Sequence, residues 1–159
     1  MVIPRLNSSI LYIEETVIPA VGSIGAALYQ RFAHWCRRNE AAKSSSHYKD
    51  ERWWTWDSYT ALSNDYPYWS KRQIRSACDK LRKVGLVKSK RHTGNKSYWY
   101  SVVNIDAWIG SEEFKKLSLK IQNQVYQIAN RRDLALKSCD KNVTLTDKNV
   151  TLTDKNVIT

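Results

Sequence analysis

Residues 70–86 read SKRQIRSACDKLRKVGL, and this segment specifies a basic amphipathic helix with defined ends. Ser70 and Gln73 form a capping box, in which each side chain can satisfy a free backbone N–H group of the other residue. One apolar stripe at helical spacing follows: Ile74, Ala77, Cys78, Leu81 and Val84. Gly85 can take the left-handed conformation that ends a helix. We therefore predict a helix over residues 70–84.

The opposite face of this predicted helix is polar and basic, as a helix that enters the major groove of DNA requires. Arg72, Arg75 and Ser76 are the candidates for base contacts, because Arg can donate two hydrogen bonds to guanine. The other basic residues suit phosphate groups. The full candidate recognition set is Ser70, Lys71, Arg72, Gln73, Arg75, Ser76, Asp79, Lys80, Arg82 and Lys83. The alternative is that this is only a solvated helix face.

The flanking segments predict a winged helix. Asp57 can cap a short preceding helix that must end before Pro67. After Gly85, residues 86–91 and 98–103 predict a β-hairpin around a turn that contains Gly94. The order of two helices followed by a basic hairpin is that of a winged helix-turn-helix. The candidate DNA-contacting residues of this wing are Lys88, Lys90, Arg91, His92, Asn95 and Lys96.

The rest of the chain contributes further helices and a repeat. Residues 9–19 show no clean period and predict a short strand or irregular segment, whereas helical spacing predicts a helix over residues 23–42 with Ser23 as its N-cap. Residues 43–51 predict an exposed loop, and residues 52–56 a short aromatic strand. From Ser111 an amphipathic pattern predicts a second long helix.

The heptapeptide DKNVTLT occupies residues 140–146, recurs at 147–153, and is followed by a degraded third copy at 154–159. Its apolar residues are not spaced for a coiled coil, so we expect a flexible tail. We therefore predict an α+β, mainly α protein in three parts. These are a winged-helix DNA-binding domain over residues 1–110, an amphipathic helix over 111–137 and a disordered tail over 138–159.

The composition limits the class of protein. The 159 residues carry 26 Lys and Arg against 15 Asp and Glu, a net charge of +11, and such a surface attracts nucleic acid. Seven Trp and nine Tyr supply the area for one compact core. We find neither a run of about 18 apolar residues nor a secretory signal, so we expect a soluble, cytoplasmic protein with no membrane partner. Cys36 and Cys78 fall on apolar helix faces, which favours a reducing compartment.

Catalysis has little support in the sequence. His34, His47 and His92 fall in a helix, a loop and the wing, and no motif for metal ligation or for phosphate binding occurs. We therefore expect no enzyme activity, metal or cofactor. The Trp and Tyr clusters could stack on single-stranded bases, although core packing is the favoured interpretation.

Four segments resemble the N-terminal winged-helix domain of phage and mobile-element replication proteins, the DnaD-like replisome organisers. They are LYQRFAHW at 28–35, YPYWS at 66–70, the helix marked by Ile74, Arg75, Leu81, Gly85 and Leu86, and YWY at 98–100. The resemblance covers about residues 10–106. The loop over residues 41–52 is longer than in the family, and we do not expect the family's usual C-terminal domain after the repeats. The resemblance implies sequence-specific duplex DNA binding in replication initiation, with host replication proteins as further partners.

The repeats add a hypothesis, because replication initiators of this kind often bind tandem DNA repeats inside their own gene. Seven codons span about 21 base pairs, about two turns of B-DNA, so successive copies would present one groove face to an array of this protein. Two other functions remain open. A transcriptional regulator would bind an operator, and a protein-interaction adapter would not bind DNA.

Overall fold

The computed structural model describes the backbone of residues 11–91, 94 and 97–158, and side chains as far as residue 138. The protein is mainly helical with small antiparallel sheets, as predicted for an α+β chain. Residues up to Val125 form one compact unit, and residues from Tyr126 onward form another. Among the described residues, none of the helices combines the length and the apolar character needed to cross a membrane.

The first long helix, α1, spans Ile18–Ala41 and follows a short 3-10 helix, η2, at Glu15–Val17. Gly22 interrupts α1 with φ 76° and ψ 176°, a conformation that Gly adopts readily. The helical turn before Gly22 was missed by the prediction, which began the helix at Ser23 and expected a strand or irregular chain before Pro19. Pro is compatible with the first turn of a helix, and Pro19 occupies that place here.

The segment after α1 is more ordered than a simple loop. It holds the 3-10 helix η3 at Ser45–His47 and the short strands β1 at Tyr48–Lys49 and β2 at Arg52–Trp53, which pair antiparallel. The predicted strand over residues 52–56 is therefore divided, because β3 begins at Thr55 and ends at Ser58. Trp54 separates the two strands; its side chain is buried and its Nε1 donates to the carbonyl of Lys49 at 2.8 Å.

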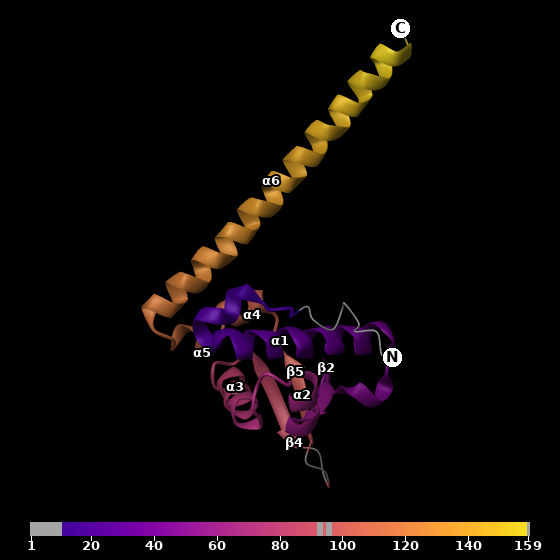
Figure 1. Ribbon diagram of the computed structural model, residues 1–159. Helices are drawn as coiled ribbons and strands as arrows, with labels where there is room; N and C mark the ends of the chain where they lie inside the picture. Colours follow the sequence, from indigo (N-terminus) through magenta and orange to yellow (C-terminus); the bar gives the residue numbers. More distant parts are fainter. Residues whose placement is uncertain (1–10, 92–93, 95–96, 159) are drawn as a thin grey trace. The chain divides into compact units, whose positions relative to one another are not determined.

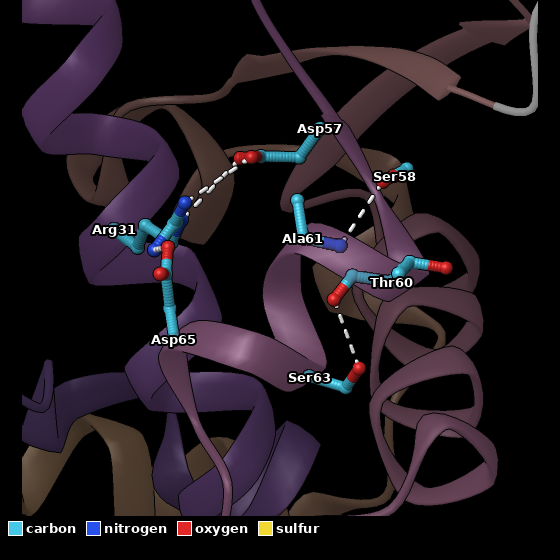
Figure 2. A network of polar contacts seen from close by, with 7 residues as sticks. All are labelled: Arg31, Asp57, Ser58, Thr60, Ala61, Ser63 and Asp65. Atoms are coloured by element: carbon cyan, nitrogen blue, oxygen red, sulfur yellow. Dashed lines mark hydrogen bonds and ion pairs between the residues drawn. The ribbon is translucent and has the colours of Figure 1, made fainter.

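The helix α2 spans Tyr59–Asp65, and its N-cap is Ser58, whose Oγ accepts a hydrogen bond from the Ala61 N–H at 3.0 Å. The prediction that Asp57 caps this helix is wrong by one residue, because the Asp57 carboxylate accepts hydrogen bonds from Arg31 instead. Figure 2 shows both arrangements.

The helix α3 spans Lys71–Lys83 and has the predicted capping box, with Ser70 N to Gln73 Oε1 at 2.9 Å and Gln73 N to Ser70 Oγ at 3.2 Å. Gly85 follows with φ 83°, and the next residue, Leu86, donates its N–H to the Leu81 carbonyl at 3.0 Å. Both predicted ends of the helix are thus confirmed.

Two strands follow α3 as the predicted hairpin, β4 at Val87–Arg91 and β5 at Ser97–Val102. They form an antiparallel sheet with β3 in the order β3-β5-β4. In Figure 1, α1 crosses over α3, α2 and this hairpin. The core lies between these layers, where Phe32 of α1 stacks on Tyr100 of β5 with ring centroids 4.2 Å apart.

Three helices complete the described chain: α4 at Ile105–Ile109, α5 at Glu112–Lys115 and α6 at Leu119–Ile158. The single helix predicted from Ser111 is divided, because Ser118 Oγ accepts from the Ile121 N–H at 3.3 Å and Gln122 Nε2 donates to the Leu117 carbonyl at 2.8 Å. These bonds satisfy backbone groups at a helix end and a helix start.

The helix α6 continues through the heptapeptide repeats, for which the sequence favoured a flexible tail. Those repeats contain neither Gly nor Pro, the residues that most often end a helix.

Candidate nucleic-acid interface

The polar face of α3 is exposed, as the sequence predicts. Arg82 is half-buried, and every other candidate residue from Ser70 to Lys83 is exposed. The apolar stripe of the same helix is buried, with Ile74, Cys78 and Leu81 at 0% exposure. The core contacts of α3 therefore fix its rotation so that its basic residues face outward.

One ridge of α3 lies farthest from the core. An α-helix turns by about 100° per residue, so residues spaced by three and four share a face. Arg72, Ser76 and Lys83 lie on this ridge, together with Asp79, directly opposite the buried stripe. Arg75 and Lys80 lie on either side of it. Arg72 and Ser76, both predicted to contact bases, thus share the most outward position of the first turns.

A groove of about 420 Å³ borders this face on the side of α1. Arg72, Ser76 and Lys80 line one wall, and the interrupted start of α1 at residues 21–24 lines the other. Gly22 has open space around its α-carbon, since a methyl group added there would have no atom within 4 Å. The start of α1 thus forms the wall of this groove opposite α3, and Gly22 adds no side chain to that wall.

Arg82 has a different environment from the other basic residues of α3. Its guanidinium donates to Ser89 Oγ at 3.1 Å, to Tyr59 OH at 3.4 Å and to the neighbouring Asp79 carboxylate, and it lies 5.6 Å from the Tyr98 ring centroid. These partners belong to α2, α3, β4 and β5. Arg82 therefore connects the elements of the domain, although the sequence suggested a phosphate contact.

The hairpin contributes exposed cations on both faces of β4, and Arg91 shares the face whose Ser89 contacts Arg82 of α3. Lys88 and Arg91 of β4 are exposed. Lys90 is also exposed, but its ammonium pairs with Asp50 in the turn between β1 and β2 and lies 5.3 Å from the Trp54 ring centroid. The other predicted wing residues, His92, Asn95 and Lys96, lie outside the described residues.

A second group of polar and aromatic residues lies between α1 and β3, and sequence reasoning did not single it out. The Arg31 guanidinium bonds both oxygens of Asp57, at 3.1 and 3.3 Å, and pairs with Asp65 at 2.6 Å (Figure 2). Burial raises the pKa of the Asp57 carboxyl above its usual value, and the bonds from Arg31 only partly offset that effect. No local pattern could reveal this network, because its members come from distant segments.

The seven tryptophans differ in exposure, and Trp53, Trp69 and Trp99 are half-buried. Trp54 and Trp108 are buried, as the core interpretation of these residues requires, whereas Trp35 and Trp56 are 38% and 48% exposed. Tyr68, which precedes α3, is 60% exposed. Trp residues at a surface are candidates for contacts with planar ligands.

Comparison with protein-family models finds no matching family, and no curated protein or solved structure matches the chain. Among the described residues there is no group of three or more His, Cys, Asp or Glu side chains that could hold a metal ion.

Proposed function

We propose that this protein is a winged-helix protein that binds a specific sequence of double-stranded DNA to initiate replication of a phage, plasmid or mobile element. The observation that carries the proposal is the exposed basic face of α3 beside the β4–β5 hairpin. In this interpretation α3 is the recognition helix and the hairpin is the wing.

The arrangement of elements supports the winged-helix assignment. The short helix α2 leads into α3 through the turn at residues 66–70, and β4 begins two residues after Gly85. The hairpin then pairs with β3, so that a three-stranded sheet lies beside the helices. A helix-turn-helix with such a hairpin can present one helix to the major groove and the hairpin to the adjacent backbone.

The placement of charge supports duplex DNA as the ligand. Arg72 on the outer ridge and Arg75 beside it can each donate two hydrogen bonds to a guanine edge. Lys71, Lys80 and Lys83 surround them, and Arg91 is exposed on the face of β4 whose Ser89 contacts Arg82 of α3. These cations suit the phosphates on either side of the groove.

Replication, rather than transcription, is favoured by the tandem heptapeptide. Where the copies share their codons, the coding DNA contains direct repeats of about two helical turns, and an array of bound copies on such repeats suits an initiation site. The candidate binding site is therefore the DNA that encodes residues 138–159.

The duplex-binding part of the proposal is tested by titrating the protein into that DNA at several salt concentrations. If about six phosphates are neutralised, log affinity falls with log salt at a slope of about −5. Arg75→Ala should lose about 1–3 kcal/mol of binding free energy on the preferred site and much less on unrelated DNA. Arg131→Ala, which removes an exposed Arg from α6, is the control for loss of charge alone.

Footprinting separates the two biological roles. Protection of the repeats in the protein's own coding region supports replication initiation, and protection of upstream DNA alone supports a transcriptional regulator. An adapter that does not bind DNA would show a salt slope near zero and no effect of Arg75→Ala.

A further inference from the structure

A cavity of about 270 Å³ opens between α1 and the edge strand β3, away from the groove beside α3. Trp35 and Asn39 of α1 line one side, and Trp56 and Asp57 of β3 line the other. The groove beside α3 uses residues 21–24 of α1, and Ser23 and Trp35 are separated by about 18 Å of helix. The two surfaces are therefore distinct.

Two of the residues that line this cavity are exposed tryptophans. Trp35 is 38% and Trp56 is 48% exposed, in a chain that buries Trp54 and Trp108 almost completely. Leaving large aromatic surface in water has a free-energy cost, so exposed Trp residues at one cavity indicate a ligand with a flat apolar face. Nucleobases have such faces, and aromatic side chains bind them by stacking.

The aromatic surface continues across the sheet and is accompanied by cations. Trp56 pairs across the strands with Trp99 of β5, and Lys49 Nζ lies 4.3 Å from the Trp99 ring centroid. The Arg38 guanidinium lies 5.4 Å from the Trp35 ring centroid. Aromatic faces bordered by Lys and Arg suit a polyanion whose bases are unstacked, because the rings take the bases and the cations take the phosphates.

The cavity also holds hydrogen-bonding groups. Asp57 lines it, and its carboxylate is 10% exposed and held in place by Arg31, which Asp65 anchors in turn (Figure 2). A carboxylate can accept about four hydrogen bonds, so the two from Arg31 leave capacity for an N–H of a base. A neutral sugar would make no use of the surrounding cations.

We infer that this surface is a binding site for single-stranded nucleic acid, in which one unstacked base enters the cavity between Trp35 and Trp56 and the adjoining backbone lies along Arg38 and Lys49. A base within a duplex cannot reach the site, since its faces are covered by its neighbours. This site is independent of the duplex-binding face of α3, and it would let one chain hold both forms of a nucleic acid.

The test measures binding of the full chain to a fluorescein-labelled dT12 oligonucleotide by anisotropy, with Trp fluorescence as a direct report of stacking. Trp35→Ala and Trp56→Ala should each weaken dT12 binding roughly 5- to 150-fold, the range for loss of one stacked base. Trp56→Phe keeps an aromatic ring and should restore most of the affinity. A parallel titration with labelled rU12 shows whether the site distinguishes RNA from DNA.

The controls separate this site from general electrostatics and from the proposed duplex function. Tyr126→Ala removes an aromatic ring of similar exposure, 44%, from α6 and should leave dT12 binding unchanged. Arg75→Ala should weaken duplex binding but not dT12 binding, and Trp56→Ala should do the reverse. Far-UV circular dichroism and thermal melting verify that each variant is folded.

Three results would overturn the inference. The first is that the wild-type chain does not bind dT12, and the second is that Trp56→Ala binds dT12 as tightly as the wild type. The third is a molecular mass in solution that rises with protein concentration in the wild type but not in the Trp variants. The last would assign the surface to self-association.

Discussion

The indole N–H of Trp108 donates a hydrogen bond to the backbone carbonyl of Val84 at 2.7 Å. Val84 is the C-cap of α3, where carbonyl groups have no partner within the helix. The side chain of Trp108 is fully buried, and its ring lies against Phe114 with centroids 4.8 Å apart. The C-terminal end of the candidate recognition helix is thus held by α4 and α5.

Trp108→Phe should therefore destabilise the domain. The substitution removes the hydrogen bond to a buried carbonyl and leaves a smaller ring in the core, so we expect a loss of about 2–4 kcal/mol in the free energy of unfolding. Urea denaturation followed by circular dichroism measures it. Trp56→Phe, at an exposed position, should change the same quantity by less than about 0.5 kcal/mol. Equal effects at the two positions would contradict the role given to Trp108.

Gly85 and Gly94 provide a matched pair for the left-handed conformation. Their φ angles are 83° and 78°, so an Ala at either position should cost about 1–2 kcal/mol. A methyl group on Gly85 would also lie 2.8 Å from Glu113 Cβ, whereas nothing lies within 4 Å of one on Gly94. Gly85→Ala should therefore be the more destabilising substitution in thermal and urea unfolding. Equal losses of unfolding free energy in the two variants would mean that α5, which carries Glu113, moves away from the added methyl group at no free-energy cost.

Arg75 and Arg82 lie seven residues apart on α3 but should behave differently. Arg82→Ala removes hydrogen bonds to Ser89 and Tyr59, and we expect the free energy of unfolding to fall by about 1–3 kcal/mol. Arg75→Ala removes an exposed side chain and should leave stability unchanged within about 0.5 kcal/mol.

Arg82→Lys tests whether geometry or charge matters at this position. Lys keeps the charge of Arg but lacks its planar set of donors. Arg82→Lys should therefore lose most of the unfolding free energy that Arg82→Ala loses. Full stability of Arg82→Lys in urea unfolding would show that charge alone is required.

Alkaline pH should unfold the protein through its buried thiol and phenol groups. Burial raises the pKa of Cys78 from 9.0 to about 12, and it raises that of Tyr29 from 10.0 to about 12. The unfolded chain releases these protons at a lower pH than the folded chain does. The stability that the protonated groups contribute is therefore complete below about pH 9 and is lost as the pH rises toward 12. Each such group lowers the free energy of unfolding by about 1.4 kcal/mol per pH unit within its window.

Cys78→Ala isolates one of these contributions. The variant should be less stable than the wild type at pH 8, because it leaves a cavity at a fully buried position. The difference should shrink between pH 9 and pH 11, since only the wild type loses the Cys78 contribution there. Urea unfolding in reducing buffer measures the free energy of unfolding of both chains at each pH. If the two pH profiles run parallel, Cys78 does not contribute to the loss of stability at alkaline pH.

Residues 70–86 were predictable because their signals are local. A capping box, an apolar stripe at helical spacing and a terminal Gly involve residues within one or two turns, and backbone geometry relates them directly. The same local signals identified the hairpin and the outward basic face of α3. The helical turn before Gly22 and the break before α6 were missed, since Pro19 and Ser118 are each compatible with more than one local structure.

The sequence by itself determined the capped basic helix, the hairpin that follows it and the excess of positive charge. Only the tertiary structure decided that Arg82 bonds Tyr59 and Ser89 while Arg75 faces solvent, and that Trp54 is buried while Trp56 is exposed. It also paired Asp57 with Arg31, 26 positions away. The physical reason is that a side chain's partner and its exposure depend on which distant segments pack against it, and no spacing within one helix or strand specifies that packing.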